Sequence, residues 1–331
     1  MTYQISVQSN GLSFAAEPDE TLLEAALRQG LTLPYGCKSG ACGACRGHIA
    51  RGEIDPGPYK PFAISEADIA AGEALFCCAH AKSDLVVEAA ITRGAQIEAK
   101  IVPVRVEALT PRAPDVMEIL LRLPANETFP FLAGQFVDFL LPEGKRRSYS
   151  IANAPEKEGV LELHVRKVSG GHFTEQVFST LKVKDVLRLE GPQGGFFLRE
   201  SDKPAILLAS GTGFAPIKAI VEHALATGDQ RAFHLYWGCR KEADLYHDLP
   251  QRWAAEYPLI RYTPVLSEPD AGWTGAAGFV HQAVLRDYPD LSGYQVYACG
   301  NPAMVDTARA DFQRLAHLPE AEFFADAFTF Q

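Results

Sequence analysis

Hydrophobic and polar positions alternate over the first part of the chain. Residues 3–7 and 12–14 each have apolar side chains at every second position, and Asn10-Gly11 lies between them. Period-two alternation on both sides of Asn-Gly is typical of two strands joined by a tight turn. Apolar residues then recur at helical spacing over 21–27, and Gly30 marks the end of that helix. Further strands of this small α+β domain are predicted at 47–50 and 84–88.

The middle of the chain consists of short strand-like segments separated by proline and glycine. Several such strands at regular intervals predict an all-β barrel. One helical segment, 174–181, interrupts the series. The predicted strands are 101–106, 116–123, 136–141, 161–165 and 186–190.

The last part of the chain alternates buried strands with helices. Residues 205–209 form an unbroken apolar strand that leads through Gly211-Thr212-Gly213 into a helix over 216–226. Unbroken apolar strands in alternation with helices predict a parallel sheet covered on both faces. Two more strands of this kind are 233–237 and 295–298. The patterns together predict three domains, over residues 1–95, 96–200 and 201–331.

The 331-residue chain has 47% apolar and 22% charged residues, which is an ordinary globular composition. Its net charge of −10 argues against a nucleic-acid-binding protein, which would carry a broad basic surface. No apolar run approaches the roughly 18–20 residues that span a bilayer. The N-terminus also lacks the basic start and apolar core of a secretory signal. The expectation is a cytoplasmic protein that binds neither a membrane nor a nucleic acid.

Seven cysteines are distributed unevenly, with most of them in the first quarter of the chain. Because cytoplasmic thiols stay reduced, they do not indicate a disulfide framework. Cys37, Cys42 and Cys45 have the C-x4-C-x2-C spacing of a plant-type [2Fe–2S] cluster, whose fourth ligand lies further along the chain. A zinc site is the weaker alternative, since structural zinc sites usually pair two short cysteine motifs and only one is present. The fourth ligand is Cys77 or Cys78, and the spacing alone does not distinguish them.

A second motif, R-x-Y-S, lies in the predicted barrel. Flavin binding requires an aromatic wall for the ring system, a hydrogen-bond donor near N5 and a cation for the phosphates. Tyr149, Ser150 and Arg147 can supply these three groups in that order. Alone, the motif is also compatible with an ordinary edge strand. A glycine-rich helix start follows, where backbone N–H groups favour a phosphate. Its candidate contacts are Val165, Lys167, Gly171 and Thr174.

The order of these motifs resembles the ferredoxin–NADP reductase superfamily. After R-x-Y-S come E-G-P-Q-G-G-F at 190–196 and G-T-G-F-A-P at 211–216, as in that family's flavin and nucleotide domains. The cysteine region resembles a plant-type ferredoxin, and aligning Ser83-Asp84 with the ferredoxin tail places the fourth ligand at Cys77. The resemblance implies a multidomain α+β and α/β protein. Its parts are a β-grasp ferredoxin domain, an antiparallel flavin-binding β-barrel and a nucleotide-binding domain with a parallel sheet.

The resemblance also implies roles in the last domain. In that family the glycine-rich turn after the first strand lies against the nicotinamide cofactor, and the C-G-x-P-x-M turn, present here from Cys299, lies near the nicotinamide C4. A plain core cysteine is the alternative for Cys299. The family's ending places an acid and an aromatic beside the flavin. The implied catalytic residues are Ser150, Cys299 and Asp326, and the implied cofactor contacts are Gly211, Thr212, Gly213, Pro216, Cys299, Gly300 and Phe328.

Residues 240–246 bear on the choice between NADH and NADPH. A 2′-phosphate site would need two or more cationic or hydroxyl groups after the second strand of this domain. Arg240 and Lys241 are cations, but two acids follow, including Asp244. Asp244 can bond to the ribose hydroxyls and repel a phosphate, which favours NADH, with Arg240 as a second contact. FAD is expected rather than FMN because it is usual in the family for this domain order.

The resemblance therefore implies an NADH-dependent reductase that contains FAD and a [2Fe–2S] cluster. Nicotinamide releases two electrons at once as hydride while the cluster carries one, so a flavin must lie between them. The same domain order is known in reductase components of multicomponent oxygenases and in deoxysugar reductases of the CDP-6-deoxy-Δ3,4-glucoseen type. Residues 325–330 of this chain most resemble the C-terminal ending of the deoxysugar reductases. The expected partner is an electron-accepting oxygenase or dehydrase component. An NADPH-dependent reductase and a redox sensor without turnover are the alternatives.

Overall fold

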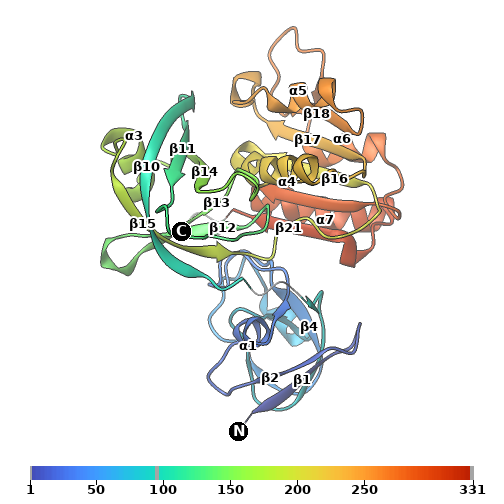
Figure 1. The fold of residues 1–331 in the computed structure, drawn as a ribbon. Helices are drawn as coiled ribbons and strands as arrows, with labels where there is room; N and C mark the ends of the chain where they lie inside the picture. The colour runs from blue at the N-terminus through green and yellow to red at the C-terminus, as the bar shows by residue number, and fades with distance from the viewer. Residues whose placement is uncertain (1, 94–96, 329–331) are drawn as a thin grey trace. The chain divides into compact units, whose positions relative to one another are not determined.

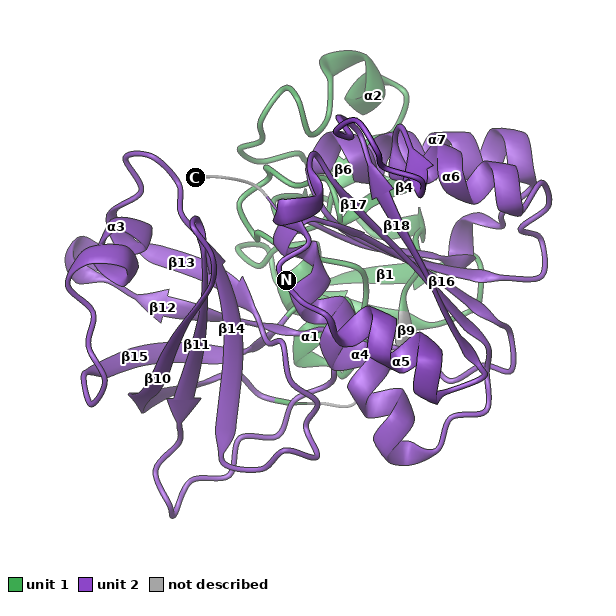
Figure 2. Ribbon diagram, turned by 90° about the horizontal axis from the view of Figure 1, so that it is seen from above, with its two compact units in different colours: residues 1–97, 194–196, 329–331 green, residues 98–193, 197–328 purple. Residues whose placement is uncertain are grey.

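The structure is a computed structural model, and it describes residues 2–93 and 97–328 (Figure 1). The chain divides into two compact units (Figure 2). Unit 1 contains the described residues up to 97 together with 194–196, and unit 2 contains 98–193 and 197–328. Unit 2 therefore holds both the predicted barrel and the predicted parallel sheet.

Unit 1 is built around a five-stranded sheet of order β2-β1-β8-β4-β6, in which β1 and β8 are parallel. Thr21 caps the start of helix α1: its hydroxyl accepts the Glu24 N–H while the Glu24 carboxylate accepts the Thr21 N–H. The helix buries Leu22 in a core with Phe14 and Phe76. The elements are β1 Tyr3–Val7, β2 Ser13–Ala16, α1 Leu22–Arg28, β3 Leu31–Thr32, β4 Arg46–Arg51, β5 Ile54–Asp55, α2 Glu66–Ala70, β6 Glu73–Leu75, β7 His80–Ala81, β8 Leu85–Glu88 and β9 Thr92–Arg93.

The first hairpin is wider than the tight turn predicted from Asn-Gly. The Val7 N–H donates to the Leu12 carbonyl at 2.8 Å, which leaves residues 8–11 in the loop. The side-chain oxygen of Asn10 accepts the Leu12 N–H at 3.1 Å, and its amide donates to the Ile91 carbonyl at 2.6 Å. The asparagine side chain thus offers the backbone an alternative to a two-residue turn.

The first part of unit 2 is a six-stranded antiparallel barrel of order β13-β12-β15-β10-β11-β14, so the prediction of an antiparallel β-barrel is confirmed. The barrel closes between the end of β13 and β14. At this closing seam Ile151 pairs with Leu163, and the Ala152 N–H donates to the Glu162 carbonyl at 2.7 Å. The elements are β10 Lys100–Ala113, β11 Val116–Arg122, β12 Phe136–Leu140, η1 Pro142–Gly144, β13 Arg146–Ser150, β14 Val160–Arg166, α3 His172–Ser179 and β15 Val186–Gln193.

The second part of unit 2 is a six-stranded parallel sheet of order β19-β18-β17-β16-β20-β21. Figure 2 shows α4 and α5 on one face and α6 and α7 on the other, so the prediction of a covered parallel sheet is confirmed. Strands are added in opposite directions from β16, which creates a topological switch point between β16 and β20. The elements are β16 Ala205–Ser210, η2 Gly211–Gly213, α4 Phe214–Thr227, β17 Phe233–Cys239, η3 Glu242–Asp244, α5 Leu249–Glu256, β18 Ile260–Leu266, β19 Ala276–Ala277, α6 Val280–Asp287, β20 Gln295–Gly300, α7 Pro302–Ala316, η4 Glu320–Glu322 and β21 Phe323–Ala327.

Within the described ranges, every helix is too short or too polar to cross a membrane. The 15 residues of α7 fall short of the roughly 20 that a membrane-spanning helix needs.

Candidate functional site

The cysteine loop of unit 1 points backbone N–H groups at sulfur. The Cys37 sulfur accepts the N–H groups of Ser39, Ala41 and Cys42 at 3.3–3.4 Å. Gly40, with φ of 69°, supplies the left-handed backbone in the middle of this turn. Hydrogen bonds from backbone amides are the contacts that stabilise ligating thiolates. The loop is therefore folded to hold sulfur anions.

The four predicted ligands lie as two pairs. The hydrogen bond from the Cys42 thiol lowers the pKa of Cys37 to about 5, and the same contact raises the pKa of Cys42. Similarly, the hydrogen bond from the Cys45 thiol lowers the pKa of Cys77 to about 3, and the same contact raises the pKa of Cys45. A [2Fe–2S] cluster takes two thiolates on each of its two irons, so two pairs of thiols are the donor set that it needs.

Cys78 lies beside this arrangement. Its sulfur is 3.5 Å from that of Cys77 and is packed against Gly40, where an added Cβ would stand 3.0 Å from it. Cys77 is the residue whose thiol bonds to Cys45, and its N–H also donates to the Cys45 sulfur at 3.4 Å.

In the barrel, the R-x-Y-S motif occupies β13. The ring of Tyr149 packs against Phe139 and Phe173, with centroids 5.9 and 5.4 Å away. Burial raises the pKa of Tyr149 to about 12, so the phenol stays neutral and can act as an aromatic wall. Arg147 lies two residues earlier on the same strand, and Ser150 ends the strand with 6% of its surface exposed.

The predicted phosphate contacts lie around the start of α3. Gly171 is the N-cap residue and offers no side chain to the first turn. The Thr174 hydroxyl donates to the carbonyls of Gly171 and Val168, so this side chain is already used to hold the turn. The Val165 side chain is fully buried in the barrel core, which leaves only its backbone for a cofactor. The Lys167 ammonium lies 5.8 Å from the Phe178 ring centroid.

Two turns meet at the switch point of the parallel sheet. A Cβ added to Gly213 would lie 2.2 Å from the Cys299 carbonyl oxygen, and one added to Gly300 would lie 2.3 Å from the Ser210 hydroxyl oxygen. The Asn301 N–H donates to that hydroxyl at 2.9 Å. Ligands of open α/β sheets bind beyond the carboxyl ends of the strands at such a point. The Gly211–Gly213 turn, with Thr212 in its middle and Pro216 buried in the helix that follows, lies there.

The predicted catalytic residues of this domain are brought together. Cys299 lies opposite Asp326 in the β20–β21 pair, and the Phe328 N–H donates to the Gly300 carbonyl at 2.8 Å. Burial raises the pKa of Cys299 well above its usual value, so its thiol stays protonated. Asp326 is 7% exposed.

The predicted nucleotide-selecting residues follow β17. The Asp244 carboxylate accepts the Lys241 N–H at 3.1 Å and so holds the η3 turn. The Lys241 ammonium pairs with Asp270 at 2.7 Å, whereas Arg240 is exposed. One of the two cations is therefore already neutralised by a carboxylate.

Arg166 is not among the candidate residues that the sequence motifs indicate. A Cβ on Gly211 would lie 3.1 Å from its Nη1, so the guanidinium contacts the glycine-rich turn. Its Nε is 3.3 Å from Asp115, and its buried Nε and Nη2 donate no hydrogen bond within the part of the chain that the structure describes. A guanidinium with unused donors beside a glycine-rich turn fits an anionic diphosphate. The signal in the sequence was its position between Val165 and Lys167.

Three family models match consecutive parts of the chain. They are the 2Fe-2S iron-sulfur cluster binding domain over residues 5–82, the oxidoreductase FAD-binding domain over 103–198 and the oxidoreductase NAD-binding domain over 207–310. A CDP-6-deoxy-L-threo-D-glycero-4-hexulose-3-dehydrase reductase of Yersinia pseudotuberculosis is 43% identical over 330 residues, covering 99% of both chains. The chain belongs to the iron–sulfur flavoprotein reductases.

Other reductases of this family are similar over the same length. The reductase component of phenol 2-monooxygenase from Pseudomonas is 35% identical over 340 residues, covering 99% of this chain and 95% of that one. Among solved structures, a cytochrome P450 reductase of Amycolatopsis matches with a TM-score of 0.77 and 35% identity over 99% of both chains. The predicted family and domain order are confirmed, and this reductase uses FAD, a nicotinamide nucleotide and a [2Fe–2S] cluster.

Proposed function

We propose that this reductase takes electrons from NADH and delivers them to a dehydrase that acts on a CDP-linked hexulose. The similarity to the dehydrase reductase supports the partner, because 43% identity over 99% of the chain exceeds the 34–38% of five reductases that serve phenol hydroxylation, terephthalate dioxygenation and aromatic O-demethylation. The position of Asp244 and the pairing of Lys241 with Asp270 support NADH, since they place two carboxylates beside one of the two cations where a 2′-phosphate would bind.

Residues of the barrel have separate roles in holding the flavin. When bound, FAD accepts a hydride from the nicotinamide and releases its electrons one at a time to the two-iron cluster. Tyr149 supplies the wall for the flavin ring, Arg147 and the start of α3 at Gly171 hold phosphates, and Ser150 donates a hydrogen bond. The remaining proposed contacts for the flavin are Val165, Lys167, Thr174 and Phe328.

The nucleotide lies, in this proposal, across the switch point of the parallel sheet. Gly213 and Gly300 allow the two turns to approach closely, and Arg166 adds a cation for the diphosphate. Cys299 contributes a neutral thiol, because burial raises its pKa, and Asp326 lies opposite it. The other proposed contacts are Gly211, Thr212, Pro216, Arg240 and Asp244.

In unit 1 the proposed cluster ligands are Cys37 and Cys42 for one iron and Cys45 and Cys77 for the other. A backbone contact joins each pair, which supports this assignment: the Cys37 N–H donates to the Cys42 sulfur and the Cys77 N–H donates to the Cys45 sulfur, each at 3.4 Å. Cys78 packs beside Cys77 as an ordinary buried residue.

A rapid-mixing experiment tests both parts of the proposal. The reconstituted protein is mixed anaerobically with NADH or NADPH, and flavin bleaching is followed; NADH should act at the lower concentration. Purified hexulose dehydrase and the oxygenase component of a phenol hydroxylase are then compared as acceptors. Steady NADH oxidation with the dehydrase is expected. Equal electron transfer to the oxygenase would show that the partner assignment is wrong, and preference for NADPH would show that the nucleotide assignment is wrong.

A further inference from the structure

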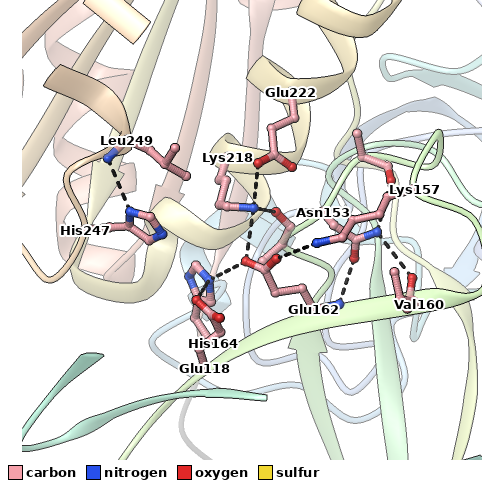
Figure 3. A network of polar contacts seen from close by, with 12 residues as sticks. Glu118, Asn153, Lys157, Val160, Glu162, His164, Lys218, Glu222, His247 and Leu249 are labelled. Atoms are coloured by element: carbon pink, nitrogen blue, oxygen red, sulfur yellow. Dashed lines mark hydrogen bonds and ion pairs between the residues drawn. The ribbon is translucent and has the colours of Figure 1, made fainter. Parts of the chain in front are cut away.

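A buried lysine joins the two halves of unit 2. Lys218 belongs to α4, the helix that starts directly after Gly211–Gly213, and only 3% of its surface is exposed. Figure 3 shows its ammonium leaving the helix toward the barrel. It donates to the Ala152 carbonyl at 3.1 Å and lies 3.0 Å from the Glu162 carboxylate and 2.7 Å from Glu222.

Its two barrel partners lie on opposite sides of the closing seam. Ala152 follows the end of β13 by two residues, and Glu162 belongs to β14. The Ala152 N–H already donates to the Glu162 carbonyl at 2.7 Å. The ammonium of Lys218 therefore contacts both edges of the seam at once. Its contact on the β13 side, Ala152, is two residues after Ser150 in the chain.

The network around Glu162 is fully occupied. His164 bonds to Glu162 at 3.0 Å through one ring nitrogen and to the Tyr246 hydroxyl at 2.9 Å through the other. Burial raises the pKa of Glu162, but the bonds from His164 and Lys218 outweigh it and hold that pKa well below the usual range. Glu118, Glu162 and His164 have ligand atoms within 4.8 Å of one another, yet the ammonium already supplies the cation that this group needs.

We propose that Lys218 is a positioning residue for hydride transfer, tying the glycine-rich nucleotide turn to the end of the flavin-binding strand. Lys218 lies on α4, fewer than two helical turns after the Gly211–Gly213 turn that leads directly into this helix. Hydride transfer requires the reacting atoms to approach within about 3–3.5 Å, so the distance between these two segments sets the rate. The inference rests on the proposed function, because it assumes transfer from the nicotinamide to the flavin.

The test uses four variants of the full reductase. K218M removes the ammonium, and K218R retains a donor for Ala152 and Glu162. The double variant K218M/E162Q also removes the charge of the buried barrel carboxylate, so Glu162 is no longer left without the ammonium of Lys218, but the tether is still absent. K203M is the matched control, because Lys203 pairs with Glu322 at 2.6 Å within the parallel-sheet domain and away from the seam.

Each variant is loaded with flavin and mixed with saturating NADH. In K218M and in K218M/E162Q the limiting rate of flavin reduction should fall about 10- to 100-fold, with an apparent NADH dissociation constant that changes less than about threefold. K218R should recover most of the rate, and K203M should match the native protein. Amide exchange over residues 150–162 is measured with and without flavin. It should become faster in K218M and in K218M/E162Q, which both lack the tether, and should stay unchanged in K203M.

Two results would overturn the inference. If K218M/E162Q reduces flavin at the native rate, Lys218 only balances a buried charge. If amide exchange over 150–162 is unchanged in K218M, the lysine does not hold the seam. A native protein whose flavin is not reduced by NADH would instead contradict the proposed function, and the exchange measurement would still decide the tether.

Discussion

Gly213 lies so close to the turn at Cys299 and Gly300 that the effect of adding a single methyl group can be worked out from the structure. A Cβ at this residue would lie 2.2 Å from the Cys299 carbonyl oxygen and 2.9 Å from the Gly300 Cα. Real Cβ contacts with backbone atoms do not fall below 3.0 Å, so Gly213→Ala must separate the two turns by at least 0.8 Å. Both contacts are to backbone, which cannot rotate away as a flexible side chain would.

The separation should lower both the rate of flavin reduction and the free energy of unfolding. Overpacking a close contact costs about 1–3 kcal/mol of unfolding free energy. A shift of about 1 Å in a reactant-holding turn lowers the rate about 10²-fold. Rapid mixing of the flavin-loaded variant with NADH measures the rate, and thermal unfolding measures the stability.

Gly293→Ala is the matched control for this substitution. Gly293 lies in the same domain, and an added Cβ there would meet nothing within 4 Å. Its rate and melting temperature should equal those of the native protein. A Gly213→Ala variant that reduces flavin at the native rate would show that the contact between the two turns does not set the position of the nucleotide.

Three further predictions concern single side chains. Cys42→Ser should abolish cytochrome c reduction while NADH still bleaches the flavin; parallel loss of both signals would contradict a sequential route. Arg166→Met should raise the NADH KM about tenfold or more, since a charge-assisted hydrogen bond contributes about 1.5–3 kcal/mol, with flavin content unchanged; an unaltered KM would exclude the diphosphate contact. Asp244→Ala should reduce the preference for NADH over NADPH at least about tenfold, because it removes a carboxylate that repels the 2′-phosphate of NADPH. The preference is measured as the ratio of the two kcat/KM values, and an unchanged ratio would show that Asp244 does not select the nucleotide.

The sequence was informative wherever a short segment carries its own reason to fold. The apolar run 205–209 predicted the central strand of the parallel sheet, and the spacing of Cys37, Cys42 and Cys45 predicted the loop that turns its amides toward sulfur. These features depend on neighbours a few residues apart. Alternation and glycine placement report such local requirements directly.

Contacts between distant segments were not predictable in the same way. Lys218 bonds to a carbonyl 66 residues away, and on sequence alone a lysine in an apolar helix looks like an exposed residue. Arg166 faces Gly211 across the boundary between the barrel and the parallel sheet. Such contacts arise from the packing of segments that are distant in the chain, and the hydrophobic periodicity of the sequence contains no information about that packing.

The cysteines show how far position decides chemistry for one residue type. Cys299 is enclosed by apolar strands and lies opposite a carboxylate, and both surroundings raise its pKa, so it remains a neutral thiol. Cys37 accepts three backbone amides and a thiol, and its pKa falls to about 5. Thiolates, not thiols, bind iron. Cys299 is therefore kept as a neutral buried thiol, whereas the contact from Cys42, followed by the backbone amides of the loop, favours the thiolate of Cys37.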